Sequence, residues 1–108
     1  MSWDIWIAVE VDGTEVEVVQ SVNYTNNCNP MIHAAGFADF PYEVNGMGCE
    51  EFCSRLDSTL RTLRSDPKSF RFMNPENGWG DYDSLVRVLS EVLDSFDRFP
   101  SATVRVSA

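Results

Sequence analysis

The sequence predicts an α+β fold of the order ββααβ, in which two amphipathic helices pack on one face of a three-stranded antiparallel sheet. Apolar and polar residues alternate over residues 3–11, 14–20 and 102–107, which is the period of a strand with one buried face. Over residues 49–65 and 81–99, apolar residues instead recur every three or four positions, which is the period of a helix. Each helix therefore has one apolar stripe that must cover the apolar face of the sheet.

The first two strands are expected to form a hairpin. One face of the first strand is entirely apolar and carries Trp3, Ile5, Ile7, Val9 and Val11. Asp12-Gly13 is a two-residue hairpin signal, because both residue types accept the positive φ that such a turn requires. In the returning strand Val16 and Val18 alternate with Glu15 and Glu17, so this strand also has one apolar face.

Residues 21–48 have no clean period. Residues 30–36 are predicted to form one or two helical turns, with Asn29 as N-cap and Pro30 at the first helical position. Residues 39–48 contain proline, asparagine and two glycines and are predicted to be a loop. A loop of this length in a small domain is typically functional or mobile.

The ends of the two long helices carry their own signals. The stripe of the first helix consists of Cys49, Phe52, Cys53, Leu56, Leu60 and Leu63, and that of the second consists of Leu85, Val86, Leu89, Val92, Leu93 and Phe96. Ser65-Asp66-Pro67 is expected to stop the first helix, and Asp81 or Asp83 to cap the start of the second. In the last strand, Val104 and Val106 are expected to face the core.

Length and charge restrict the functional classes. With 108 residues the chain is expected to be a single domain, 1–108. Its 17 acidic and 8 basic residues give a net charge of −9, which repels phosphate backbones and predicts no binding to nucleic acid. The same charge is compatible with simple solvation or with docking on a basic partner, including by mimicry of DNA.

The sequence also predicts a cytoplasmic protein that does not enter a membrane. Its longest apolar run, Ile5 to Val9, has five residues, whereas a membrane span needs about 20. The first residues, MSWDIW, lack the basic and apolar regions of a signal peptide. The glycosylation pattern Asn23-Tyr24-Thr25 is then without consequence, and three cysteines, an odd number, argue against a disulfide framework.

Metal binding and catalysis are weakly indicated. The four candidate zinc ligands are Cys28, His33, Cys49 and Cys53, but their spacing lacks a C-x2-C pair, and the last two cysteines belong to a helical apolar stripe. Neither a metal nor a cofactor is therefore expected. Cys28 and His33 are also a candidate nucleophile and base, although no pattern for an orienting group or an oxyanion hole accompanies them.

Two loops combine the residue types of a ligand site. The candidate residues in loop 71–82 are Arg71, Asn74, Asn77, Trp79 and Tyr82, and those in loop 23–30 are Asn23, Tyr24, Thr25 and Asn27. Asn-Pro and Asn-Gly are ordinary turn formers, but a turn needs no tryptophan, and glycines on both sides of Trp79 permit close approach to a ligand. Aromatic faces beside amide groups suit a heterocycle or a polar metabolite. Both loops are expected at one rim of the sheet, where they would form a pocket.

The motifs NYTxN (Asn23, Tyr24, Thr25 and Asn27) and NPxNGWGxY (Asn74 to Tyr82), with the C-terminal ATVRVS, resemble small bacteriophage-encoded proteins of unknown function. This resemblance spans most of the chain, does not include the cysteines, and implies a phage accessory protein in the host cytoplasm without an assigned chemistry. The sequence therefore predicts a non-enzymatic protein that sequesters a small polar or nucleotide-like ligand between the two loops. The alternatives are an acidic inhibitor that docks on a basic host protein and, less favoured, a small hydrolase. A pocket at the loops favours the first function, and a flat rim favours the inhibitor.

Overall fold

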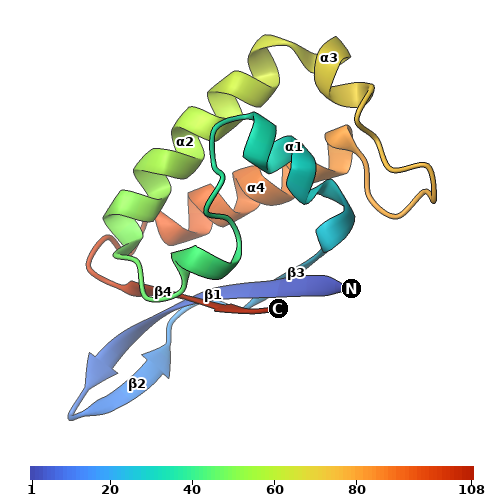
Figure 1. Cartoon of the computed structure of the whole chain (residues 1–108). Coiled ribbons are helices and arrows are strands. Elements are labelled where there is room, and N and C mark those ends of the chain that lie inside the picture. Colours follow the sequence, from blue (N-terminus) through green and yellow to red (C-terminus); the bar gives the residue numbers. More distant parts are fainter.

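The computed structural model describes residues 1–108 as an antiparallel sheet with its helices on one face (Figure 1). The four strands are β1 (Ser2–Val11), β2 (Thr14–Glu17), β3 (Val22–Thr25) and β4 (Thr103–Ser107). The four α-helices are α1 (Asn29–Ala34), α2 (Cys49–Ser65), α3 (Pro67–Arg71) and α4 (Tyr82–Phe96), and two short 3-10 helices are η1 (Asn26–Cys28) and η2 (Tyr42–Val44). None of the helices is long and apolar enough to cross a membrane.

β1 is the central strand of the sheet. Ile5 of β1 pairs with Val22 of β3 on one side and with Val106 of β4 on the other. Further along β1, Ala8 pairs with Glu17 of β2 and also with Thr103 of β4. β2 and β3 therefore follow one another along one edge of β1, and β4 occupies the other edge.

The predicted count of three strands is wrong, because the predicted second strand ends at Glu17 and an additional strand, β3, follows it. Five positions separate Glu17 from Val22, whereas their partners Ala8 and Ile5 are only three positions apart. The two additional residues interrupt the pairing at the edge of the sheet. β2 therefore keeps only the first part of the predicted strand 14–20, and β3 lies at Val22–Thr25, in residues for which no strand was predicted. The adjacent apolar residues Val18 and Val19 lie at this break, where the alternation of the sequence also stops.

The two predicted long helices are confirmed, and they lie side by side across the sheet (Figure 1). α2 ends at Ser65 as predicted, and Asp81 is the N-cap residue of α4. α1 corresponds to the turns expected at residues 30–36, but it begins one residue earlier, so its N-cap residue is Cys28 and not the predicted Asn29. α3 was not predicted; it begins at Pro67, and the carboxylate of Asp66 caps it by accepting a hydrogen bond from the Ser69 N–H.

The core lies between the helical layer and the apolar face of β1. Trp3, Ile5 and Ile7 are fully buried there, in one cluster with the stripes of α2 and α4. The Trp3 indole Nε1 donates a hydrogen bond of 3.0 Å to Oδ1 of the buried Asn29, so the polar atom of this large side chain is satisfied. The tip of the β1–β2 hairpin extends beyond the helices (Figure 1), and Val11 and Val16 are 50% and 42% exposed.

Candidate functional site

The loops 23–30 and 71–82 meet at the N-terminus of α4. Tyr24 of β3 places its hydroxyl 2.7 Å from Ser84 Oγ, and the backbone N–H of Asp81 donates to the same hydroxyl at 3.3 Å. The Tyr24 ring packs against Trp3, with 5.8 Å between the ring centroids. The predicted juxtaposition of the two loops is therefore present, and its centre is Tyr24.

The junction of the loops is closely packed around Gly80. A Cβ atom at this position would lie 2.7 Å from Thr25 Cγ2 and 2.9 Å from both Cys28 Sγ and the Tyr24 hydroxyl. The glycine had been expected to let the backbone approach a ligand, but it lets one loop approach the other. The two surface cavities of the chain lie elsewhere, and neither is lined by residues of both loops.

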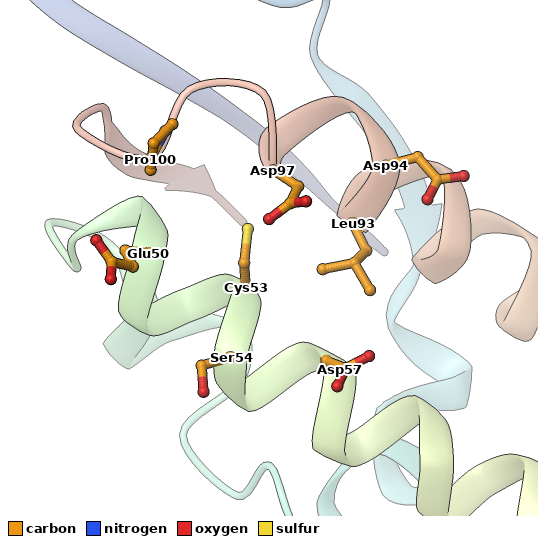
Figure 2. A pocket seen from close by; sticks show the side chains of 8 residues that line it. All are labelled: Glu50, Cys53, Ser54, Asp57, Leu93, Asp94, Asp97 and Pro100. Atoms are coloured by element: carbon orange, nitrogen blue, oxygen red, sulfur yellow. The ribbon is translucent and has the colours of Figure 1, made fainter.

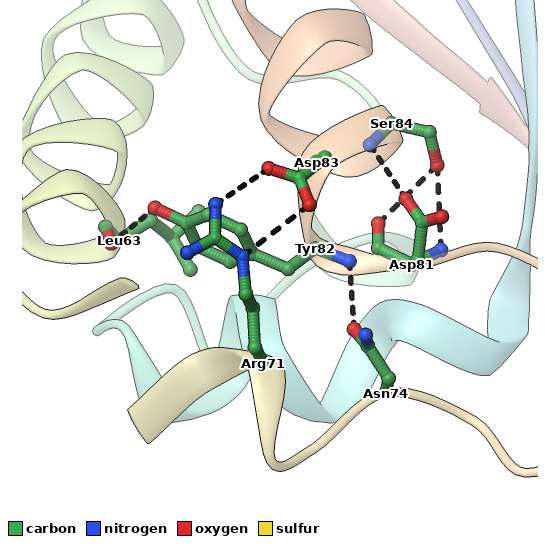
Figure 3. Close-up of polar contacts among 7 residues, drawn as sticks. All are labelled: Leu63, Arg71, Asn74, Asp81, Tyr82, Asp83 and Ser84. Carbon is green, nitrogen blue, oxygen red and sulfur yellow. Dashed lines mark hydrogen bonds and ion pairs between the residues drawn. The ribbon is translucent and has the colours of Figure 1, made fainter. Parts of the chain in front are cut away.

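The positive end of α4 is occupied by the chain's own side chains (Figure 3). Asp81 Oδ1 accepts a hydrogen bond of 2.7 Å from the Ser84 N–H, and the Asp81 N–H donates in return to Ser84 Oγ at 3.3 Å. This reciprocal capping satisfies the backbone amides of Asp81 and Ser84, which are therefore not free to bind an external anion. Arg71 binds Asp83 through two nitrogens, at 2.8 and 3.3 Å, and holds the pKa of that carboxyl below its ordinary value. The ion pair therefore forms at neutral pH and is lost only as the pH falls through this lowered pKa.

Tyr82 and Asn74 anchor the loop 71–82. Tyr82 is buried, and its hydroxyl donates a hydrogen bond of 2.7 Å to the Leu63 carbonyl at the end of α2 (Figure 3). Asn74 Oδ1 accepts a hydrogen bond of 2.8 Å from the Tyr82 N–H. The guanidinium of Arg71 lies over the Tyr82 ring, 5.0 Å from its centroid. These three predicted ligand-binding residues therefore hold the loop on α2 and α4.

The predicted residues of the first loop are also engaged within the chain. The Asn23 side-chain amide donates to Ser2 Oγ and Asp4 Oδ1, both at 3.1 Å, and so ties β3 to β1. Thr25 Oγ1 accepts a hydrogen bond of 3.2 Å from the Asn27 N–H and caps η1. The Asn27 side chain itself is exposed.

Three large apolar side chains of the second loop remain exposed. Phe72 is 82% exposed, Met73 38% and Trp79 66%. Asn77 Oδ1 accepts a hydrogen bond of 2.9 Å from the Trp79 N–H, which defines the turn that presents the indole. The sequence interpretation identified Trp79 but missed Phe72 and Met73, although two adjacent apolar residues between Arg71 and Asn74 were a usable signal. A shallow cavity of about 320 Å³, lined by Lys68, Arg71 and Phe72, adjoins them.

A second group of polar residues lines a groove between α2 and α4 that sequence reasoning missed (Figure 2). The cavity has a volume of about 390 Å³ and is lined by Glu50, Cys53, Ser54, Asp57, Leu93, Asp94, Asp97 and Pro100. Of its four carboxylates, those of Glu50 and Asp57 lie on α2, that of Asp94 lies on α4 and that of Asp97 directly follows α4, and no basic side chain lines the cavity. The spacing of Glu50 and Asp57, and that of Asp94 and Asp97, places each pair on one face of a helix. The sequence does not show that these two faces meet. No group of three or more His, Cys, Asp or Glu side chains in the chain is placed to hold a metal ion.

The four candidate zinc ligands lie in three separate places. Cys28 Sγ is 3.6 Å from the Tyr24 hydroxyl, while the His33 ring Nε2 hydrogen-bonds to the Phe40 carbonyl. Cys49 Sγ lies 3.9 Å from Cys53 Sγ and donates to the Phe96 carbonyl at 3.3 Å. Burial raises the pKa of the Cys28 thiol, so this group is a poor nucleophile without a base beside it.

The thiol of Cys53 is expected to react very slowly in the folded protein. Burial raises its pKa to about 12, so only about one thiol in ten thousand is ionised at pH 8. Mass-spectrometric labelling with iodoacetamide should therefore modify Cys53 slowly in the native state and rapidly after denaturation. Between pH 8 and 10 the native rate should rise about tenfold per pH unit, because the thiolate is the reacting species. A native rate that levels off near pH 9 would contradict this expectation.

Outside the β1–β2 hairpin, two surface features are therefore candidate sites. One is the group of exposed apolar residues on the 71–82 loop, and the other is the acidic groove. The first lies on residues 71–82, between α3 and α4, and the second between α2 and α4. Comparisons of the chain with protein-family models, with curated proteins and with solved structures find no match, so only its own residues bear on its function.

Proposed function

We propose that the chain is a non-enzymatic binding protein that docks on another protein through the 71–82 loop. The observation that carries this proposal is the exposure of Phe72, Met73 and Trp79 on one short segment. Aromatic residues and methionine are enriched in protein interfaces, and tryptophan is among the residues that most often dominate their binding energy. Exposed apolar residues that occur singly are normal, whereas contiguous apolar patches mark interaction surfaces, and we infer that these three residues form such a patch.

The backbone of the 71–82 loop is fixed before any partner arrives. Arg71 is held by Asp83, Asn74 by the Tyr82 N–H, and Gly80 by its packing against loop 23–30. Because these contacts order the loop in the free protein, binding does not have to pay for its ordering. This explains why most of the predicted site residues face the chain itself: they support the loop, and the exposed side chains make the contact.

The partner that fits this surface is a basic protein with an apolar depression. The net charge of −9 attracts a positively charged partner over several ångströms and raises the rate of encounter. Within the loop, Glu76 is exposed and adds negative charge to the segment that makes the contact. Inhibition of a basic host protein is thus the form of the proposal that agrees with the phage resemblance.

A small ligand is the second candidate function, and the cavity beside Phe72 favours it. Lys68 supplies positive charge, since Arg71 is paired with Asp83, and Phe72 supplies an aromatic face, so a small aromatic anion matches this cavity of about 320 Å³. This location differs from the expected pocket between the two loops. Hydrolysis has less support, because Cys28 has a raised pKa and His33 is bonded to a backbone carbonyl.

The proposal can be tested by replacing Trp79 with the photo-crosslinker p-benzoylphenylalanine. Irradiation in an extract of the native cell should join the chain to a basic protein, identified by mass spectrometry. The matched control carries the same crosslinker at Tyr42, which is equally exposed at 66% but lies on η2. The adduct should form from position 79 and not from position 42.

The outcome separates the candidate functions. Addition of Phe72→Ser to the position-79 variant should abolish the adduct, because one partner surface contacts both aromatic residues. Equal adducts from positions 79 and 42 would show that the loop is not the contact surface. Retention of a small mass in native mass spectrometry, lost on Lys68→Ala, would replace protein docking by ligand binding.

A further inference from the structure

The tip of the β1–β2 hairpin presents an unpaired strand edge at the end of the molecule away from the 71–82 loop (Figure 1). β2 pairs only with β1, and all four of its residues are exposed. The outer edge of β4 is different, because the chain itself covers it. Gly46 N–H donates to the Val104 carbonyl at 2.7 Å, and Val104 N–H donates to the Met47 carbonyl at 2.8 Å.

The free edge of β2 consists of the peptide groups of Glu15 and Glu17. Val18 N–H donates a hydrogen bond of 3.1 Å to the Ile7 carbonyl, so the peptide groups of Val18 point toward β1. In an antiparallel ladder this direction alternates along the strand, so Val16 also faces β1 while Glu15 and Glu17 face away. Two N–H groups and two carbonyls are thus available to an added strand.

The side chains of this edge divide into an apolar and an acidic face. Val16 pairs with Val9 on the same face as Val11, beyond the cover of the helices, where Val11 and Val16 are half exposed. On the other face, Glu10 pairs directly with Glu15, which places two carboxylates opposite one another. Arg105 binds the Glu15 carboxylate through two nitrogens, both at 2.9 Å, and is the cation paired with this carboxylate.

We propose that an extended segment of a basic partner adds to β2 as an antiparallel strand. Its side chains opposite Glu15 and Glu17 are Lys or Arg, and the residue between them, opposite Val16, is apolar. Backbone hydrogen bonds supply affinity in this mode of binding, and alternate side chains supply specificity. A second copy of the chain fits worse, because symmetric pairing about Val16 places Glu15 of one copy opposite Glu17 of the other.

A capped peptide, Thr-Lys-Val-Lys-Thr, is the direct probe of this site. NMR-detected amide hydrogen exchange should show that saturating peptide slows exchange at the Glu15 and Glu17 N–H groups. The same peptide with both lysine backbone nitrogens methylated should give no protection, since it keeps the charges but cannot donate to the strand edge. Glu17→Lys should weaken binding about tenfold by turning an attractive cross-strand pair into a repulsive one.

The controls distinguish strand addition from general attraction between opposite charges. Glu91→Lys changes the net charge equally at an exposed position of α4 and should leave peptide affinity within about twofold. Equal loss from Glu91→Lys and Glu17→Lys, or equal binding of the methylated peptide, would overturn the proposal. Protection of Glu15 and Glu17 that grows with protein concentration alone would overturn it in favour of a second copy. Trp79→Ala should leave peptide binding unchanged, so this result does not depend on the fate of the loop proposal.

Discussion

Gly80→Ala is expected to lower the free energy of unfolding by about 2–5 kcal/mol, as much as truncation of a core side chain. The added methyl group would lie 2.7 Å from Thr25 Cγ2 and 2.9 Å from both Cys28 Sγ and the Tyr24 hydroxyl. Forcing an extra carbon into a packed contact costs about 1–3 kcal/mol. Gly80 also has φ of +87°, which adds about 1–2 kcal/mol for a residue with a side chain. Urea unfolding followed by circular dichroism measures the loss.

Gly78→Ala is the matched control for this prediction. Gly78 has φ of +75° and belongs to the same loop, but no heavy atom beyond its two chain neighbours lies within 4 Å of its Cβ position. Its substitution should therefore cost only the backbone contribution of about 1–2 kcal/mol. The difference between the two variants measures the close approach of the loops. Equal losses would mean that loops 23–30 and 71–82 are less tightly joined than the structure shows.

The parts of the fold that the sequence predicted are those in which burial repeats along the chain. The hairpin and the two long helices have apolar faces of the correct period, because one side of each element must leave water. β3 and α3 show no such periodic pattern, because they have only four and five residues. Their positions depend on contacts with other parts of the chain. Asn23 is an example: asparagine is unfavourable in strands, yet its amide donates to Ser2 and Asp4 of β1.

The meeting of the two loops was predicted, but the use of their polar groups within the chain was not, for a chemical reason. Groups that bind a ligand, such as the Asn74 amide and the Tyr82 hydroxyl, bind the chain's own peptide groups equally well. Residue identity does not decide between these uses, because it does not show which groups a fold leaves unpaired. Trp3 and Trp79 illustrate the point, since the first is fully buried and the second is largely exposed. The acidic groove was missed because it requires the relative placement of α2 and α4.

Leu89→Ala and Trp79→Ala are expected to have opposite effects on stability and binding. Leu89 is buried on the α4 stripe, so its truncation leaves a cavity and should cost about 2–5 kcal/mol of stability. Trp79 is 66% exposed, so its truncation should change stability by no more than about 0.5 kcal/mol. Thermal and urea unfolding of the two variants test this before any partner is identified.

The binding half of this contrast follows from the same geometry. Because the Trp79 side chain is exposed on a fixed backbone, it does not contribute to packing of the core. Any large effect of Trp79→Ala must therefore be a loss of affinity for a partner. Loss of the indole at the centre of an interface typically weakens binding by about 2 kcal/mol or more, whereas Leu89→Ala should leave the affinity of the remaining folded protein unchanged. Isothermal titration with the protein captured by crosslinking at position 79 measures both affinities. If Trp79→Ala unfolds the chain as strongly as Leu89→Ala, the indole belongs to the core, and the 71–82 loop loses its central contact residue.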